Sequence, residues 1–259
     1  LDGVPPTRTG AFIEPYLPDD VHGAHFHGDT LLQPAELTDW LRRVADAGLS
    51  AKIHCTGDAS AREVLNAVET LRAEGYTETR YQVAHGQFIH PDDIARFGAL
   101  GVSADISPFI WVPGPIVEAI REVLPRERAD RMQPNRALLD TGAVVAGGSD
   151  WPVSPSPNAW EGIHGLVTRE DPSGQYPGTL WLEQAITLEE AITAFTIGGA
   201  EAMGLAGETG SLEIGKSADF AVLDRDPFAH PATELARTRV AETWFEGRRV
   251  FARRDMVAD

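Results

Sequence analysis

Apolar residues follow two different spacings over the first 204 positions of the chain. Short continuous apolar runs, typical of strands, are separated by stretches in which apolar residues recur at helical spacing. The apolar runs predict strands at 49–55, 79–85, 101–109 and 142–150. The helical spacing predicts helices at 34–48, 59–75, 91–101, 114–140 and 187–204. Strands that alternate with helices in this way indicate βαβ units and a parallel sheet, and their continuous apolar character indicates burial on both faces.

The pattern changes at about residue 205. The stretches 210–226 and 239–253 contain short apolar runs and glycine turns but little helical spacing. A change of period of this kind indicates a change of architecture. We therefore expect an α/β domain over residues 1–204 and a small all-β segment over residues 205–259. Residues 1–34, rich in proline, glycine and aspartate, are expected to form loops.

Composition narrows the class of protein. The chain has 259 residues, of which 42% are hydrophobic and 24% charged, as in a globular protein with a substantial core. A formal charge of −17 argues against nucleic acid or an anionic membrane as a partner, because phosphate groups would be repelled. No apolar run reaches the length of a membrane span, and the N-terminal stretch does not resemble a signal peptide, so we expect a cytoplasmic protein. Arginine in place of nearly all lysine suggests a bacterial source.

Three polar residues stand where predicted strands end. His54 ends the first apolar run, His85 ends the second, and Asp150 ends the fourth. In a parallel α/β barrel the catalytic groups project from the C-terminal ends of the strands. Each residue alone could be a core or capping group, but two histidines and a carboxylate from separate strands are suitable ligands for zinc or a related divalent ion. The sequence therefore predicts a metal site here.

Residues close to His54 add to this prediction. Lys52 precedes His54 by two positions, so both side chains face the same side of a strand. We expect Lys52 to pair with an acid inside the barrel, with a role as a ligand as the alternative. Cys55 points the other way and is expected to be buried. Asp58, in a Gly-Asp turn, is expected to cap the next helix or to orient a histidine.

The segment after Asp150 supplies candidates for contact with a substrate. Trp151 and His164 are expected in or near loops at the same end of the barrel, where they either line a substrate pocket or pack the loops together. Arg169 either binds a substrate carboxylate or pairs with a neighbouring acid. The conspicuous pair His25 and His27 follows no apolar run, so we expect it to lie in a loop rather than to bind the metal.

Five stretches, in order along nearly the whole chain, resemble the amidohydrolase family 3 (YtcJ-like) branch of the metal-dependent amidohydrolases. They are IHCTGDAS, RYQVAHGQFIHPDDIARFGALGV, GGSDWPVSPSPNAWEGIHGLVTRE, TLEEAITAFTIGGAEAMG and GSLEIGKSADFAVLDRDP. The resemblance implies a (β/α)8 TIM-type barrel with a flanking β-sandwich. This chain would hold barrel strands five to eight and the C-terminal portion of the sandwich. By position, His54 and His85 would be the ligands of the fifth and sixth strands, and Asp150 the aspartate of the eighth.

The activity that this resemblance implies is hydrolysis of carbon–nitrogen bonds other than ordinary peptide bonds. One or two divalent ions, most often zinc, would activate water, and Asp150 would accept its proton and pass it to the leaving nitrogen. The substrate would be a small-molecule amide. Deaminases and cyclic-amide hydrolases use the same ligand set, and the sequence leaves these alternatives open.

The resemblance also implies that further metal ligands of the family, a strand-one H-x-H pair and a fourth-strand lysine, lie upstream of Leu1. A half-barrel would expose the edges of its sheet. We therefore expect either a homo-oligomer, or a complementary chain that supplies strands one to four, or a fragment without activity of its own.

Overall fold

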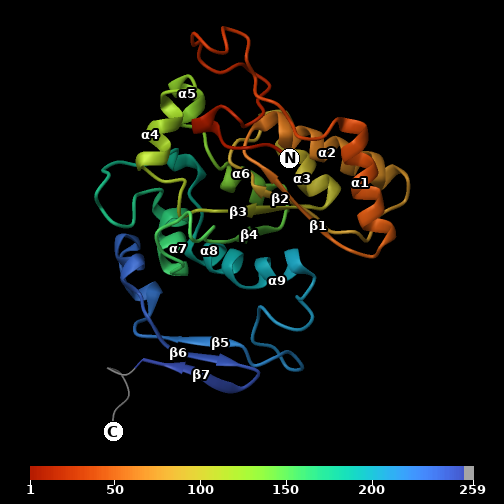
Figure 1. Ribbon diagram of the computed structural model, residues 1–259. Coiled ribbons are helices and arrows are strands. Elements are labelled where there is room, and N and C mark those ends of the chain that lie inside the picture. The colour runs from red at the N-terminus through yellow and green to blue at the C-terminus, as the bar shows by residue number, and fades with distance from the viewer. Residues whose placement is uncertain (254–259) are drawn as a thin grey trace.

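The computed structural model describes residues 1–253 and contains two sheets (Figure 1). The first is parallel, with its strands in the order β1-β2-β3-β4, and the second is antiparallel, with the order β5-β6-β7. The parallel strands are β1 (Ala51–Cys55), β2 (Tyr81–His85), β3 (Val102–Ile106) and β4 (Val145–Gly147). The antiparallel strands are β5 (Phe220–Leu223), β6 (Val240–Phe245) and β7 (Arg248–Ala252). The predicted parallel sheet and the later all-β segment are both present.

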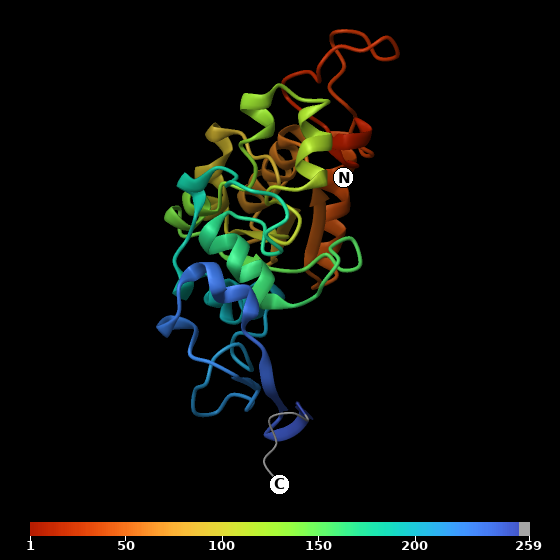
Figure 2. The same ribbon diagram turned by 90° about the vertical axis from the view of Figure 1, so that its left-hand side faces the viewer.

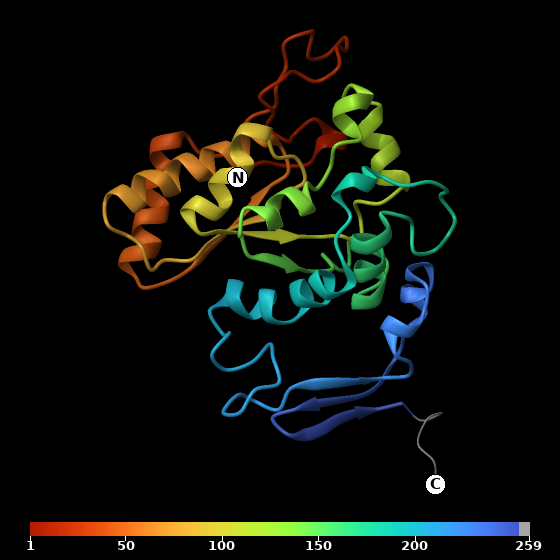
Figure 3. The same ribbon diagram turned by 180° about the vertical axis from the view of Figure 1, so that it is seen from behind.

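The helices are α1 (Pro34–Asp46), α2 (Asp58–Ala73), α3 (Pro91–Leu100), α4 (Pro115–Arg121), α5 (Arg126–Ala129), α6 (Asn135–Asp140), α7 (Ala159–Thr168), α8 (Leu188–Phe195) and α9 (Ile197–Met203). Of these, α1 precedes β1, α2 to α6 connect the parallel strands, and α7 to α9 follow β4. Short 3₁₀ turns add η1 (Pro5–Thr7), η2 (Leu182–Gln184), η3 (Pro227–Ala229) and η4 (Ala232–Arg237). Figures 1 and 3 show α1, α2 and α3 gathered at one side of the sheet, with α8 and α9 between it and the small sheet.

The register of the parallel sheet separates an apolar face from a polar one. Ile53, Val83, Ala104 and Val145 form one row across the four strands, and they pack into the main hydrophobic core with α1, α2 and α3. The next row toward the C-terminal ends contains His54, Ala84, Asp105 and Ala146 on the other face. The prediction of burial on both faces therefore holds for β2 and most of β3, whereas β1 leaves Lys52 exposed.

Two predicted helices are divided in the structure, one helix was not predicted, and the strand predicted at 142–150 is limited to Val145–Gly147. The helical stretch 114–140 is divided into α4, α5 and α6, because Pro125 and Pro134 cannot continue a helix. The stretch 187–204 is divided at Thr196, whose φ of −126° and ψ of −100° are not helical. The helix α7 was not predicted at all, since glycines at two of its positions weaken the helical pattern.

The small sheet and the N-terminal loop lie at opposite ends of the molecule, as the side view shows (Figure 2). The loop around residues 17–27 projects from one end, and β5, β6 and β7 form the other. The division into two domains at residue 205 remains a prediction. Within residues 1–253, no helix combines the length and the apolar character needed to cross a membrane.

Candidate functional site

Strands β1, β2 and β3, together with residues that follow β3 and β4, line a pocket of about 370 Å³. The residues that line it are polar or small: Lys52, His54, Ala84, His85, Asp105, Ser107, Gly148 and Asp150. The pocket thus brings together His54, His85 and Asp150, the three residues singled out as strand-end ligands. It also contains Lys52, and it adds Asp105 and Ser107, which the sequence analysis did not single out.

The two histidines lie beside each other although strand geometry alone would separate them. The register pairs His54 with Ala84 and Cys55 with His85, so simple alternation would place His85 on the face of Cys55. His85 instead has a φ of 69°, in the left-handed region, and this turns its side chain into the pocket. The ring centroids of His54 and His85 are 4.7 Å apart, with the ring planes at 76°.

Each imidazole has a polar neighbour at Nδ1. His54 Nδ1 lies 3.5 Å from Asp2 Oδ1, and His85 Nδ1 lies 3.2 Å from Ser107 Oγ. These contacts leave Nε2 of each ring as the atom available to bind a ligand. Burial and the neighbouring His54 lower the pKa of His85, against the opposing effect of Asp150 and Asp105. The neutral imidazole, which is the form that binds metal ions, is therefore favoured at His85.

Asp150 follows β4 in a tight turn. Its φ is 54°, again in the left-handed region, and its carbonyl accepts a hydrogen bond of 2.8 Å from the Val153 backbone N–H. The main chain of Asp150 therefore closes the turn that leads to Trp151, while the residue lines the pocket. Asp150 thus closes this turn with its main chain and lines the pocket, and its role as a metal ligand stays a prediction.

The donor atoms in the pocket suit a divalent metal ion, but they form an incomplete set. Two imidazoles and a carboxylate are ligands that zinc commonly takes. Over residues 1–253, no three His, Cys, Asp or Glu side chains converge closely enough to hold an ion by themselves. The close pair is His54 and His85, and Asp150 lies on the pocket wall. The residues present therefore fit a metal as part of a larger ligand set.

Lys52 and Asp105 form an ion pair next to the histidines. Lys52 Nζ is 2.5 Å from Asp105 Oδ2, as expected for a lysine paired with an acid. Asp105 stands in the same cross-strand row as His54, so its side chain faces the same side of the sheet. The signal for Asp105 was available in the sequence, because an acidic residue within the apolar run 101–109 must be paired or face a polar site.

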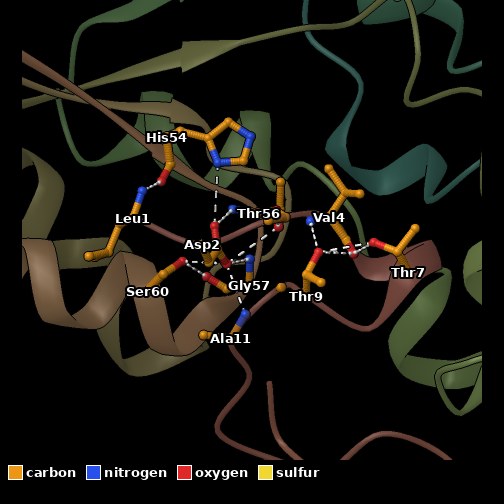
Figure 4. A network of polar contacts seen from close by, with 12 residues as sticks. Leu1, Asp2, Val4, Thr7, Thr9, Ala11, His54, Thr56, Gly57 and Ser60 are labelled. Atoms are coloured by element: carbon orange, nitrogen blue, oxygen red, sulfur yellow. Dashed lines mark hydrogen bonds and ion pairs between the residues drawn. The ribbon is translucent and has the colours of Figure 1, made fainter. Parts of the chain in front are cut away.

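Asp2 is the second residue that the sequence analysis missed. Its side chain is buried and lies behind His54 in a network of hydrogen bonds (Figure 4). Burial raises the pKa of Asp2, but His54 and the backbone N–H groups of Ala11, Gly57 and Thr56 outweigh this effect and lower it. No local pattern marks Asp2, because its partners are brought to it only by the fold.

Asp58 and Cys55 lie close to the pocket in sequence but do not line it. Asp58 is the first residue of α2, and its carboxylate accepts a hydrogen bond of 2.9 Å from the Ile13 backbone N–H. It therefore ties the N-terminal loop to α2, while Gly57 occupies the N-cap position. Burial raises its pKa. Cys55 is buried as predicted, and burial raises the pKa of its thiol to about 12.

The candidates after Asp150 lie away from the pocket lining. Trp151 is 61% exposed. His164 is buried within α7, so the expected loop position was wrong, and burial lowers its pKa. Arg169 is also buried, and its guanidinium donates hydrogen bonds of 2.8 Å to the carbonyls of Leu180 and Met132. Arg169 therefore anchors backbone and does not pair with an acid, and burial lowers its pKa to about 10.

The histidine pair of the N-terminal segment lies outside this pocket. His25 and His27 are in irregular structure, as predicted, and neither lines the pocket. His27 Nδ1 lies 3.2 Å from the Phe12 carbonyl oxygen. The pair is thus part of the loop that packs beside Phe12.

A parallel α/β sheet with histidines and carboxylates at the C-terminal ends of its strands defines a class of fold that places its chemistry at one face. The sequence model described as "Amidohydrolase family" matches residues 1–251, and the chain belongs to this family. Among curated proteins, it is 30% identical to "N-substituted formamide deformylase" of Arthrobacter pascens over 88% of this chain and 42% of that protein. It is 27% identical to "Putative amidohydrolase YtcJ" of Bacillus subtilis over 96% of this chain and 46% of that protein.

Solved structures show the same fold. An uncharacterized metal-dependent hydrolase from Pyrococcus horikoshii matches with a TM-score of 0.72 and 25% identity, over 89% of this chain and 44% of the other. An adenosine deaminase from Xanthomonas campestris with bound zinc matches with a TM-score of 0.59 and 18% identity, over 87% and 51%. The chain thus spans less than half the length of the two curated relatives named above.

Proposed function

We propose that this chain carries part of the active site of a metal-dependent hydrolase that cleaves carbon–nitrogen bonds other than ordinary peptide bonds. The observation that carries the proposal is the pair His54 and His85, with ring centroids 4.7 Å apart, in one pocket with Asp150. Family membership supports the reaction class. The relative named as a formamide deformylase supports a small-molecule amide as the substrate.

We propose His54 and His85 as metal ligands through Nε2, with Asp150 as the neighbouring carboxylate. Zinc suits this donor set, and one similar structure is described with zinc bound. A divalent ion, when bound, would acidify water and polarise the carbonyl oxygen of an amide. The ligands that complete the set would come from outside residues 1–259.

Asp150 would carry the proton in this reaction. Its carboxylate would accept a proton from the attacking water and deliver it to the nitrogen of the leaving amine. Lys52 and Asp105 form an ion pair beside the histidines, so each of these two charges is balanced by the other. A neutral His85, favoured by burial, would keep a lone pair on Nε2. A deaminase or cyclic-amide hydrolase would use the same groups and differ in the substrate bound.

We further propose that β1 to β4 are strands five to eight of a (β/α)8 barrel, and that β5 to β7 belong to its β-sandwich. In the parallel sheet, β1 and β4 are the two edges, so additional strands can pair on either side. The match to 44% of the Pyrococcus horikoshii hydrolase supports a chain that forms about half of such a protein. Strands one to four would come from an upstream segment, from a complementary chain or from a second copy.

Substitution of the pocket residues in the whole protein tests the proposed activity. We expect His54→Ala and His85→Ala to lose bound zinc, measured by elemental analysis, because each removes a ligand. Asp150→Ala should lower kcat for an N-substituted formamide by about 10²- to 10⁴-fold, the usual effect of losing a general acid–base group.

His25→Ala is the matched control for these substitutions, since His25 lies outside the pocket. Its metal content and its turnover should equal those of the unaltered protein. Normal metal content and normal turnover in all three pocket variants would contradict the proposal. Release of ammonia from a purine or a cyclic amidine, without formamide hydrolysis, would favour a deaminase.

A further inference from the structure

Asp2 lies directly behind His54, although it comes from a loop that does not line the pocket. Figure 4 shows its carboxylate facing Nδ1 of the His54 ring, with the second ring nitrogen on the side turned away from Asp2. The Oδ1–Nδ1 distance is 3.5 Å, and His54 Nδ1 is itself buried. The amino group of Leu1 donates a hydrogen bond of 2.7 Å to the His54 carbonyl oxygen, so the same loop also holds the main chain of His54.

The Asp2 carboxylate is fixed by hydrogen bonds from three different segments. Oδ1 accepts from the Thr56 backbone N–H at 2.9 Å. Oδ2 accepts from the backbone N–H groups of Ala11 and Gly57 and from the Ser60 hydroxyl, each at 2.9 Å. With these donors in place, the carboxylate cannot turn away from His54 without breaking several charge-assisted hydrogen bonds.

An ionised carboxylate only accepts hydrogen bonds, so it favours a proton on the polar atom that faces it. His54 Nδ1 lies 3.5 Å from Asp2 Oδ1, and within residues 1–253 this buried nitrogen makes no hydrogen bond to any other group. A proton on Nδ1 leaves the lone pair of the neutral ring on Nε2. Neutral histidine in water prefers the opposite form, with the proton on Nε2, so the arrangement at Asp2 reverses the intrinsic preference.

We propose that Asp2 is a positioning residue that holds the His54 imidazole as the Nδ1–H tautomer, with its Nε2 lone pair directed into the pocket. The role of that lone pair as a metal ligand rests on the proposed function, whereas the tautomer itself does not require a metal. Asp2 would thus fix the tautomer and orientation of His54 in the absence of a metal ion, and it links the N-terminal loop to the pocket.

The ¹⁵N chemical shifts of the His54 ring test this proposal. The whole protein, labelled with ¹⁵N at histidine and freed of metal by a chelator, would be measured at about pH 8, above the usual pKa range of histidine. His54→Asn assigns the His54 signals by their disappearance. We expect a pyrrole-type shift for Nδ1 and a pyridine-type shift for Nε2. A protein whose His54 carries its proton on Nε2 would overturn the proposal, whatever the variants do.

Two variants separate positioning from general stabilisation. In Asp2→Asn, the three donors at the Oδ2 position favour the amide oxygen there, so the amide NH2 faces His54 Nδ1. We therefore expect the His54 proton to shift toward Nε2 and the zinc affinity to fall by about 10- to 100-fold. Ser60→Ala is the matched control, because it removes one bond to Oδ2 and leaves Oδ1 facing His54. It should keep the Nδ1–H tautomer.

The outcomes distinguish this proposal from the proposed function. The Nδ1–H tautomer in a protein that binds no zinc would contradict the metal-dependent activity and still support positioning by Asp2. If the folded Asp2→Asn variant keeps the Nδ1–H tautomer of His54, positioning by Asp2 is wrong, while the proposed metal site is unaffected. If Asp2→Asn does not fold, the tautomer of the unaltered protein decides.

Discussion

The backbone conformations of single residues decide which side chains reach the pocket. His85 and Asp150 both have positive φ, which is uncommon for residues other than glycine. Such conformations cost about 1–3 kcal/mol each and persist where the surrounding structure imposes them. Here they bring an imidazole and a carboxylate to the same end of the sheet as His54. Positive φ is not confined to the pocket, since five other non-glycine residues within residues 1–253 share it, but at His85 and Asp150 it shapes the proposed site.

His164 provides a test at the scale of one residue, outside the pocket. Burial lowers its pKa below the ordinary value of 6.5. Below that pH the unfolded chain binds a proton that the folded chain does not, so the free energy of unfolding falls as the pH drops from 6.5 toward the folded pKa. We expect His164→Leu to lose less of this free energy than the unaltered protein between about pH 7 and pH 5.

Urea unfolding at several pH values measures this difference. Above pH 6.5, where His164 is neutral in the folded and the unfolded state, the free energy of unfolding should depend on pH in the same way for the variant and the unaltered protein. Identical slopes for the two proteins below that pH would show that His164 does not contribute to the acid sensitivity.

The start of α2 depends on a close approach between two segments. A Cβ atom added to Gly57, the N-cap residue, would lie 1.9 Å from the Ala11 carbonyl oxygen and 2.5 Å from the Ala11 carbonyl carbon. Both are backbone atoms, so this steric clash can be removed only if the N-terminal loop moves away from α2. Such a movement would also disturb the hydrogen bonds from Ala11 and Gly57 to Asp2.

We therefore expect Gly57→Ala to lower the free energy of unfolding by about 1–3 kcal/mol, the usual effect of forcing extra atoms into a packed site. Gly207→Ala is the matched control, because a Cβ atom there meets open space. Denaturant unfolding measures both variants. Equal stability of the two variants would contradict the close packing of the loop on α2.

The molecule as a whole presents surfaces that the missing strands of the proposed barrel and β-sandwich would cover. The strands β1 and β4 are open edges, and a mostly apolar cavity of about 990 Å³ lies between α7, α8 and α9 and the small sheet. On the small sheet, Phe245, Val250 and Phe251 are exposed. Open edges and exposed apolar patches favour association. We propose that these surfaces are covered in the complete protein.

Residues 1–259 produced alone should consequently self-associate. The formal charge of −17 opposes the approach of two copies, so association should strengthen when salt screens that charge. Sedimentation velocity at several protein and salt concentrations measures this directly. Protein that also contains four preceding barrel strands is the control and should associate less. A chain of residues 1–259 that stays monomeric throughout would contradict the proposal.

The sequence by itself determined the alternation of strands and helices, the parallel sheet and the side of β1 that carries Lys52 and His54. These features depend on local periodicity, which burial of an apolar face imposes on neighbouring residues. It also marked His85 at the end of β2 and Asp150 in the turn after β4, because a polar residue after an apolar run interrupts that pattern.

Only the tertiary structure decided the surroundings of these residues. The contact of Asp2 with His54, the pairing of Lys52 with Asp105 and the burial of Arg169 against two carbonyl groups join segments that are distant along the chain. No local pattern encodes such contacts, because they arise when the sheet and its loops pack together. For the same reason, the helical position of His164 became visible only in the fold.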